Sequence, residues 1–143
     1  MANPILFFSD VSAYTITGSQ LYSGSNSWSN LNDFEPNSVW QSANTTANQC
    51  LTVDLGSDVS INAIVIEGHN ILTTDEGLFV TCTGSANPPT NQTSALGYSL
   101  GNIRTLMSAD PVYVAIGTPP TARYVRFRFE APTVAPSIGN IFI

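Results

Sequence analysis

The sequence predicts an all-β protein, a single antiparallel β-sandwich of about eight strands with little or no helix that spans residues 1–143. Short apolar stretches with strand-like alternation recur along the chain and are separated by clusters of Gly, Pro, Asn and Ser. Windows with uninterrupted helical spacing of apolar residues are nearly absent. With 143 residues, 43% of them hydrophobic, the chain has the size of one ordinary domain and enough apolar side chains for a core.

The candidate strands are short and are joined by polar turns, a pattern typical of sandwiches and barrels. In chain order they are Ile5–Phe8, Tyr14–Thr17, Gln49–Leu55, Ile61–Glu67, Leu78–Thr83, Arg104–Met107, Val112–Ile116, Arg123–Glu130 and Ile138–Ile143. Between the third and the fourth, Asp54-Leu55-Gly56 is predicted to form a turn. There Asp54 would accept backbone N–H groups, and Gly56 would allow a positive φ.

Two of these strands indicate how the sheets are covered. In residues 123–129 the apolar side chains occupy every second position, so one face meets the core and the other, with Arg126 and Arg128, meets solvent or a partner. Those two arginines could bind a carboxylate on a neighbouring subunit. The alternative is that they pair with Asp or Glu on adjacent strands of their own sheet. In Ile61–Ile66 both faces are apolar, which predicts a central strand covered on both sides.

Charge and apolar patterning argue against several function classes. The net charge is −6, only 10% of residues are charged and lysine is absent, so nucleic-acid binding is not predicted. No apolar run approaches the roughly 20 residues that a membrane helix needs. The first residues lack a basic region, so we expect no secretory signal and synthesis in a cytoplasm.

Two long stretches, Gly18–Ser42 and Gly84–Gly97, are predicted to be loops, and long loops of this kind are often functional. The first is rich in Ser and Asn but carries several aromatic side chains. Its Tyr22 and Trp28, with Asp33, are the candidate ligand-binding residues, and simple loop packing is the alternative for the two aromatic rings.

The sequence predicts no metal site, no cofactor and no catalytic residues. Asp33 and Glu35 could offer oxygens to calcium, but a dedicated calcium-loop spacing is absent and Asx turns explain the same residues. His69 has no nucleophile or carboxylate partner in the sequence pattern, so we expect a hydrogen-bonded loop histidine. Cys50 and Cys82 are expected to be buried thiols, with a disulfide as the alternative. The protein is therefore not expected to be an enzyme.

Four segments carry a resemblance to a known family. They are VWQS (39–42), CLTVDLG (50–56), INAIVIEG (61–68) and ARYVRFRF (122–129). In order and spacing, across roughly residues 28–130, they resemble the discoidin or F5/8-type C domain, one of the galactose-binding-like jelly rolls. The resemblance implies a jelly-roll sandwich. The terminal cysteine pair of the extracellular members is missing. Trp40 is expected to pack over the sandwich edge beside the Asp54 turn, with stacking on a sugar as the alternative.

The end of the chain resembles a different set of proteins with a similar sandwich. GHN at Gly68–Asn70 and the closing APSIGNIFI (135–143) are similar to small virion proteins of tailed phages. This implies a non-enzymatic virion component, decorating the capsid or sitting in the tail, with coat or tail proteins and further copies of itself as partners. The alternative is a carbohydrate-binding module that recognises glycans through its loops.

Overall fold

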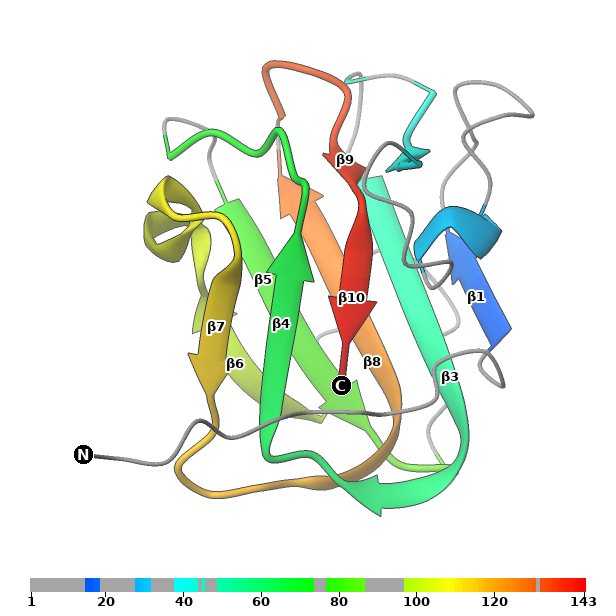
Figure 1. Ribbon diagram of the computed structural model, residues 1–143. Coiled ribbons are helices and arrows are strands. Elements are labelled where there is room, and N and C mark those ends of the chain that lie inside the picture. The colour runs from blue at the N-terminus through cyan, green and yellow to red at the C-terminus, as the bar shows by residue number, and fades with distance from the viewer. Residues whose placement is uncertain are drawn as a thin grey trace.

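Two antiparallel β-sheets lie face to face in the structure (Figure 1). The computed structural model describes residues 15–18, 28–31, 38–43, 45, 49–73, 77–86, 97–130 and 132–143. The larger sheet has the order β1-β3-β8-β5-β6, formed by β1 (Thr15–Gly18), β3 (Gln49–Ser60), β8 (Thr121–Glu130), β5 (Gly77–Thr83) and β6 (Tyr98–Asn102). The smaller has the order β10-β4-β7, formed by β10 (Asn140–Phe142), β4 (Ala63–Glu67) and β7 (Val112–Ala115). The predicted jelly-roll sandwich is confirmed.

A short two-stranded pair and two 3-10 helices complete the described structure. The pair consists of β2 (Trp40–Gln41) and β9 (Ser137–Ile138), and the helices are η2 (Trp28–Leu31) and η3 (Arg104–Ser108). Within the described ranges no helix is long and apolar enough to cross a membrane.

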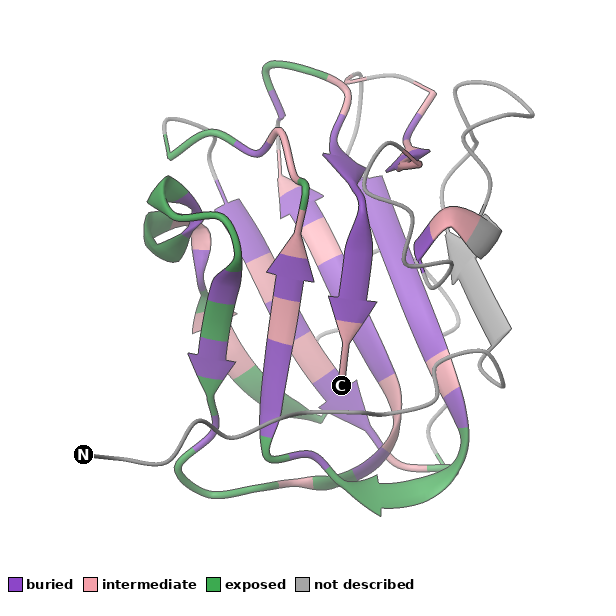
Figure 2. Ribbon diagram, in the orientation of Figure 1, coloured by how far each residue is buried: buried purple, intermediate pink, exposed green. Residues whose placement is uncertain are grey.

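The core fills the space between the two sheets, and the inward side of β8 lies at its centre (Figure 2). Val125 and Phe127 are 0% exposed and Phe129 is 2% exposed, as the alternation in the sequence predicted. On the neighbouring strands β3 and β5, Leu51, Val53, Leu78 and Val80 are also fully buried. The opposite sheet contributes Ile64, Ile66 and Ile141. Inward side chains of both sheets therefore form one apolar layer.

The outward side of β8 differs from the prediction at Arg126. This arginine is only 6% exposed, its Nε donates to Thr52 Oγ1 at 3.4 Å, and burial lowers its pKa. Arg128 pairs with Glu130 in its own strand at 2.8 Å and lies over the ring of Phe79. Arg126 is therefore not at a solvent-exposed position. Its described contact is to Thr52, its cross-strand neighbour in the same sheet, so it runs across strands as the alternative predicted, with a hydroxyl in place of a carboxylate.

Strand β4 lies at the centre of the smaller sheet, as the doubly apolar sequence predicted. Ile64 and Ile66 face the core, and Val65 on the other side is half-buried. Val65 is paired with Phe142 on one side and with Tyr113 on the other. These three side chains form a cross-strand row on the outside of the sheet, which we call the outer row, and Tyr113 in it is 49% exposed.

Several predicted element boundaries change in the structure. The segment Arg104–Met107 forms the 3-10 helix η3 instead of a strand. Strands β2 and β6 were not predicted, because β2 has two residues and β6 is polar and largely exposed. Strand β3 continues to Ser60 through a bulge between Asp54 and Val59, so Asp54-Leu55-Gly56 bends one strand instead of joining two. The candidate strand Ile5–Phe8 lies outside the described residues.

We predict that Phe127→Ala destabilises the protein by about 3–5 kcal/mol, because it removes a fully buried aromatic ring and leaves a cavity between the sheets. Urea denaturation followed by fluorescence measures the change in the free energy of unfolding. Leu106→Ala is the control: this side chain is 43% exposed on η3, and its loss is expected to cost on the order of 0.5 kcal/mol. Equal effects of the two variants would contradict the core described above.

Candidate functional site

Connections from distant parts of the chain meet at one end of the sandwich, the upper end in Figure 1. We call this the loop end and define it as residues 68–73 after β4, residues 109–111 before β7, residues 132–137 after β8, and strand β2. The bulged part of β3 and the turns at 61–62 and 116–120 lie at the opposite end. Jelly-roll strands run between these two ends, so residues far apart in sequence become neighbours where the strands stop.

Asn70 joins two of these connections. Its side-chain Nδ2 donates to the carbonyl of Ala135 at 2.9 Å, and its Oδ1 accepts the N–H of Ser137 at 2.8 Å. Its backbone N–H also donates to the carbonyl of Ser137, at 3.3 Å. One carboxamide thus donates to one backbone group and accepts from another, and these groups are 65 and 67 residues away in the sequence.

Gly68 and His69 fasten the same connection to the residues before β7. The backbone N–H of Gly68, which has φ +64°, donates to Asp110 Oδ1 at 2.9 Å. His69 Nε2 lies 3.0 Å from the carbonyl of Ala109, and His69 Nδ1 lies 3.3 Å from the backbone N of Ile71. A carbonyl can only accept, so Nε2 carries the proton and Nδ1 accepts from Ile71. Both ring nitrogens are therefore committed to backbone, as expected for a loop histidine.

Strand β2 joins the loop end through its pairing with β9 and a buried polar contact. The backbone N–H of Ser42 donates to the carbonyl of Pro136 at 3.0 Å, and Ser42 Oγ donates to Gln49 Oε1 at 2.6 Å. Trp40 is 0% exposed and stacks on Phe129 with ring centroids 5.9 Å apart. The packing interpretation of Trp40 is confirmed. Its predicted place beside Asp54 is wrong, because Phe129 pairs with Gln49 at the other end of β3.

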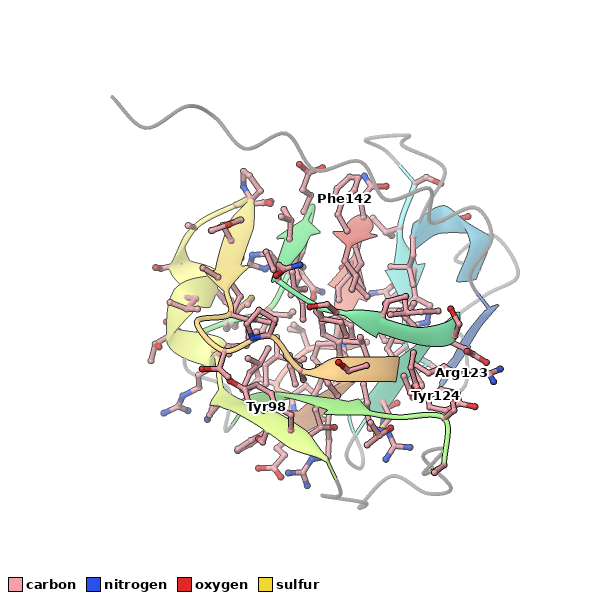
Figure 3. The ribbon with its side chains drawn as sticks, turned by 90° about the horizontal axis from the view of Figure 1, so that it is seen from below. Tyr98, Arg123, Tyr124 and Phe142 are labelled. Atoms are coloured by element: carbon pink, nitrogen blue, oxygen red, sulfur yellow. The ribbon has the colours of Figure 1, made fainter. Side chains whose placement is uncertain are left out.

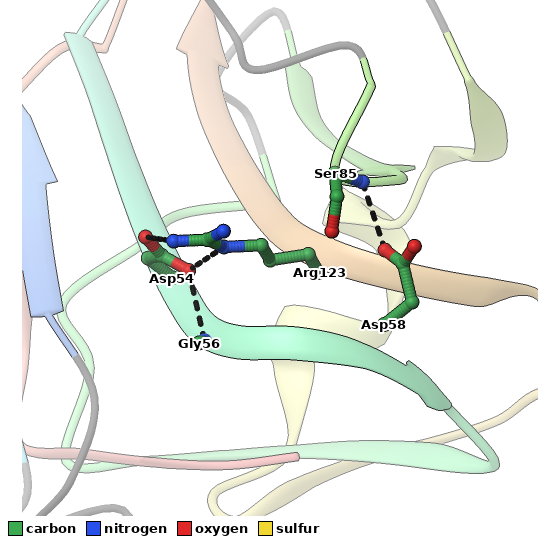
Figure 4. A network of polar contacts seen from close by, with 5 residues as sticks. All are labelled: Asp54, Gly56, Asp58, Ser85 and Arg123. Carbon is green, nitrogen blue, oxygen red and sulfur yellow. Dashed lines mark hydrogen bonds and ion pairs between the residues drawn. The ribbon is translucent and has the colours of Figure 1, made fainter.

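The opposite end is organised by charge (Figure 4). Asp54 Oδ1 and Oδ2 accept from Arg123 Nε and Nη2 at 2.6 and 2.9 Å, and Oδ1 also accepts the N–H of Gly56 at 2.8 Å. The Arg123 hydrogen bonds hold the pKa of Asp54 below its ordinary value of 3.8. The Arg123 guanidinium lies 5.1 Å from the ring centroid of Tyr124, and the two side chains are seen together from below in Figure 3. Gly56 has φ +79°, so the predicted roles of Asp54 and Gly56 are confirmed.

The described residues contain no group of three or more His, Cys, Asp and Glu side chains that could hold a metal ion. Cys50 and Cys82 are free, buried thiols. Burial raises the pKa of both, that of Cys82 to about 11, so neither has the thiolate character that a reactive cysteine needs.

The predicted ligand residues fall largely outside what the structure describes. Tyr22 and Asp33 lie outside the described residues, as does the side chain of Trp28. The backbone of Trp28 begins η2, which contacts β1, β2 and β10. The segment with these residues leaves β1 at Gly18, which pairs with Leu51 of β3, includes η2 at 28–31, and reaches Ser38 just before β2. Its later end therefore adjoins β2, which belongs to the loop end.

Sequence reasoning missed the joining role of Asn70 and the partners of His69. The GHN run was noticed only through its resemblance to other sequences. A local pattern can mark Gly68 as a turn glycine. It cannot show that the carboxamide of Asn70 meets residues after β8, because that contact exists only once the sheets have formed.

With the geometry established, comparison with known proteins identifies the family. The family model for the F5/8 type C domain matches residues 15–142, and the chain belongs to this family. No curated protein matched the sequence.

Solved structures with the same fold include several sugar-binding proteins. Chitosan-binding module 1, derived from a chitosanase/glucanase of Paenibacillus sp. IK-5, has a TM-score of 0.72 at 18% identity, covering 94% of this chain and 98% of that one. A fucolectin from the serum of Morone saxatilis, the striped bass, has a TM-score of 0.74 at 14% identity, covering 96% of this chain and 48% of that one. The family 32 carbohydrate-binding module of Clostridium perfringens NanJ, solved with galactose, has a TM-score of 0.65 at 17% identity, covering 92% and 93%.

We predict that Arg123→Gln makes the stability of the protein less sensitive to acid. The pKa of Asp54 is lower in the folded chain than its ordinary value of 3.8, so the stabilisation is complete above that value and is lost as the pH falls through the folded-state pKa. The thermal midpoint of the variant should lie below that of the wild type near neutral pH, and the two should converge in acid. The partner variant Asp54→Asn removes the other member of the pair and should show the same reduced sensitivity to acid. A parallel curve for Arg123→Gln would contradict the role of the pair.

Proposed function

We propose that the chain is a non-catalytic adhesion module that binds saccharides at its loop end. The observation that carries this proposal is the set of hydrogen bonds that lock the connections after β4, before β7 and after β8 to one another. Binding surfaces built from loops lose less entropy on binding when the loops are already held in place. The opposite end is held by the Arg123–Asp54 ion pair and by contacts within and between its turns, such as that of Ser85 N–H with Asp58 Oδ1 at 2.8 Å.

The groups exposed at the loop end suit a saccharide. Thr73 and Thr133 offer hydroxyls, and the exposed apolar side chains beside them are Leu72 and Val134, at 45% and 41%. Hydroxyls, amides and a few apolar contacts match the mixed polar and apolar surface of a sugar ring. Tyr22, Trp28 and Asp33 belong to the segment that leads into β2 at this end, and we propose that its aromatic rings add a stacking surface.

Family membership and fold support the same proposal. The similar structures named above comprise a chitosan-binding module, a fucolectin and a module solved with galactose. Their sequences are too different from this one to transfer a sugar or a contact residue. They support the general class of ligand, and the particular saccharide remains to be measured.

Charge at the loop end favours neutral or amine-bearing saccharides over acidic ones. Asp110 is exposed and Glu67, which directly precedes Gly68, is half-buried. Arg128, in the strand that runs toward this end, is paired with Glu130. A carboxylated sugar would therefore meet like charges.

We predict that the purified protein binds at least one saccharide from a panel of galactose, fucose and glucosamine oligomers, and binds sialylated glycans more weakly than these. Separate Tyr22→Ala, Trp28→Ala and Asp33→Ala variants are expected to weaken the binding of that saccharide, with at least one variant losing about tenfold or more in affinity. Isothermal titration calorimetry measures each dissociation constant.

The matched control for this series is Tyr98→Ala. Tyr98 is 39% exposed at the start of β6, at the end opposite the loops (Figure 3), and its removal should leave the affinity unchanged. Absence of binding to every neutral and amine-bearing saccharide would overturn the proposed function. Equal losses in Tyr98→Ala and the loop variants would overturn the assignment to the loop end.

Attachment to other proteins is a second candidate function, and the outer row of Phe142, Val65 and Tyr113 is the observation that favours it. An apolar row that includes a half-exposed tyrosine can contribute to a protein contact. The virion role, the coat or tail partners, the oligomeric state and the location in a virion stay predictions from the sequence.

We predict that, if this attachment includes self-association, Tyr113→Glu weakens it by about tenfold or more, since a charge replaces an aromatic ring in the contact. Sedimentation equilibrium compares the variant with the wild type, and Tyr98→Glu is the matched control. A wild-type chain that stays monomeric at its highest soluble concentration would exclude self-association through this row.

A further inference from the structure

The run Gly68-His69-Asn70 is the best-connected part of the loop end. Gly68 and His69 contact Asp110 and Ala109, before β7, and Asn70 contacts Ala135 and Ser137, after β8. We call this run the clasp. Its three residues make contacts to two connections that otherwise belong to different parts of the chain.

Within the clasp, the side chain of Asn70 makes a matched pair of hydrogen bonds. Its carboxamide donates at 2.9 Å and accepts at 2.8 Å on backbone groups two residues apart. A neighbouring strand would satisfy the same groups in the same way, so the side chain acts as a short strand edge. Aspartate has no N–H to donate to Ala135, and alanine has neither group.

The contacts of Asn70 set the relative position of two exposed rims. Leu72 and Thr73 follow the clasp directly, and Thr133 and Val134 directly precede Ala135. Each rim exposes one apolar side chain and one hydroxyl. Without Asn70, the described side-chain bonds that join the first rim to the second are lost, although Gln41 Nε2 still reaches the carbonyl of Ala135 at 3.5 Å.

We propose that Asn70 is a positioning residue for saccharide recognition, which holds the rim at Thr133 and Val134 against the rim at Leu72 and Thr73 so that a ligand contacts both. This inference rests on the proposed function and adds the residue that prepares the site for its ligand. Asn70 acts through Ala135 and Ser137. Its effect on affinity is therefore an effect of preorganisation.

The test compares Asn70→Ala and Asn70→Asp with the control Asn62→Ala. Asn62 is exposed at the opposite end, where its Nδ2 donates to the carbonyl of Ser60 at 3.4 Å. Affinity is measured by calorimetry for the saccharide that the wild type binds, below the melting transition of each variant. Amide hydrogen exchange is measured at Ser137, Thr133 and Val134, with Leu51 and Val53 of β3 as internal references.

Asn70→Ala is expected to speed exchange at Ser137 about tenfold or more, to speed it at Thr133 and Val134, and to weaken the affinity about tenfold or more. Exchange at Leu51 and Val53 should not change. Asn70→Asp keeps the acceptor for Ser137 and loses the donor to Ala135, so exchange at Ser137 should stay slow while the affinity falls. The control variant should resemble the wild type throughout.

Two results would overturn the inference, and they can be told apart. Faster exchange at Ser137 in Asn70→Ala with unchanged affinity would make Asn70 a structural residue only, and the proposed function would stand. Absence of any saccharide binding by the wild type would remove the proposed function and the positioning role together. Should Asn70→Ala fail to fold, Asn70→Asp decides the question, and full affinity in that variant would overturn the positioning role.

Discussion

The packing of the two sheets against each other is the interaction on which the rest of the structure depends. Strand β8 lies between β3 and β5, and its inward row of Val125, Phe127 and Phe129 faces the apolar side of the smaller sheet. Burial of this row together with the apolar side chains that it contacts is the main driving force available to a β-sandwich. Once the sheets are stacked, every strand must end at one of two ends, and the connections between strands are gathered there.

The two ends are then stabilised by different chemistry. At the loop end, side-chain amides, an imidazole and a carboxylate bind backbone groups of neighbouring connections. At the opposite end, the Arg123–Asp54 pair bridges β8 and the bulge of β3. Most of the loop-end bonds are between uncharged groups, so they fix loop shape with little dependence on salt, and the bond of Gly68 to the Asp110 carboxylate is the exception. Such bonds suit the neutral, hydrogen-bonding ligand that we propose.

The family and the site chemistry lead to one consistent picture of function. The chain belongs to the F5/8 type C domain family, and its described residues provide a committed histidine, two inert buried thiols and no metal-binding group. In the binding function that we propose, selectivity comes from shape and hydrogen bonding. The clasp residues Gly68, His69 and Asn70 are then part of the scaffold that gives the surface its shape.

Much of the fold could be predicted from local pattern. The alternation in β8, the central position of β4 and the roles of Asp54 and Gly56 depend on residues a few positions apart, so periodicity and turn chemistry reveal them. The exceptions have physical causes. Strand β6 is too polar to show alternation, and η3 has only five residues, too few to show a helical period. The candidate site was harder to predict. Its ligand residues were selected from the composition of one predicted loop, and no local pattern indicated Asn70, which joins the connections at the loop end.

The sequence by itself determined that two apolar faces would stack and that a polar segment with several aromatic residues, Gly18–Ser42, would precede the first long strand. Only the tertiary structure decided that Asn70 would meet Ala135 and Ser137, that Arg126 would be buried, and that Trp40 would pack on Phe129. The physical reason is the separation in sequence between the residues that interact. Periodicity records which face of one strand is apolar, whereas a hydrogen bond between residues 65 positions apart depends on how all the strands between them are placed.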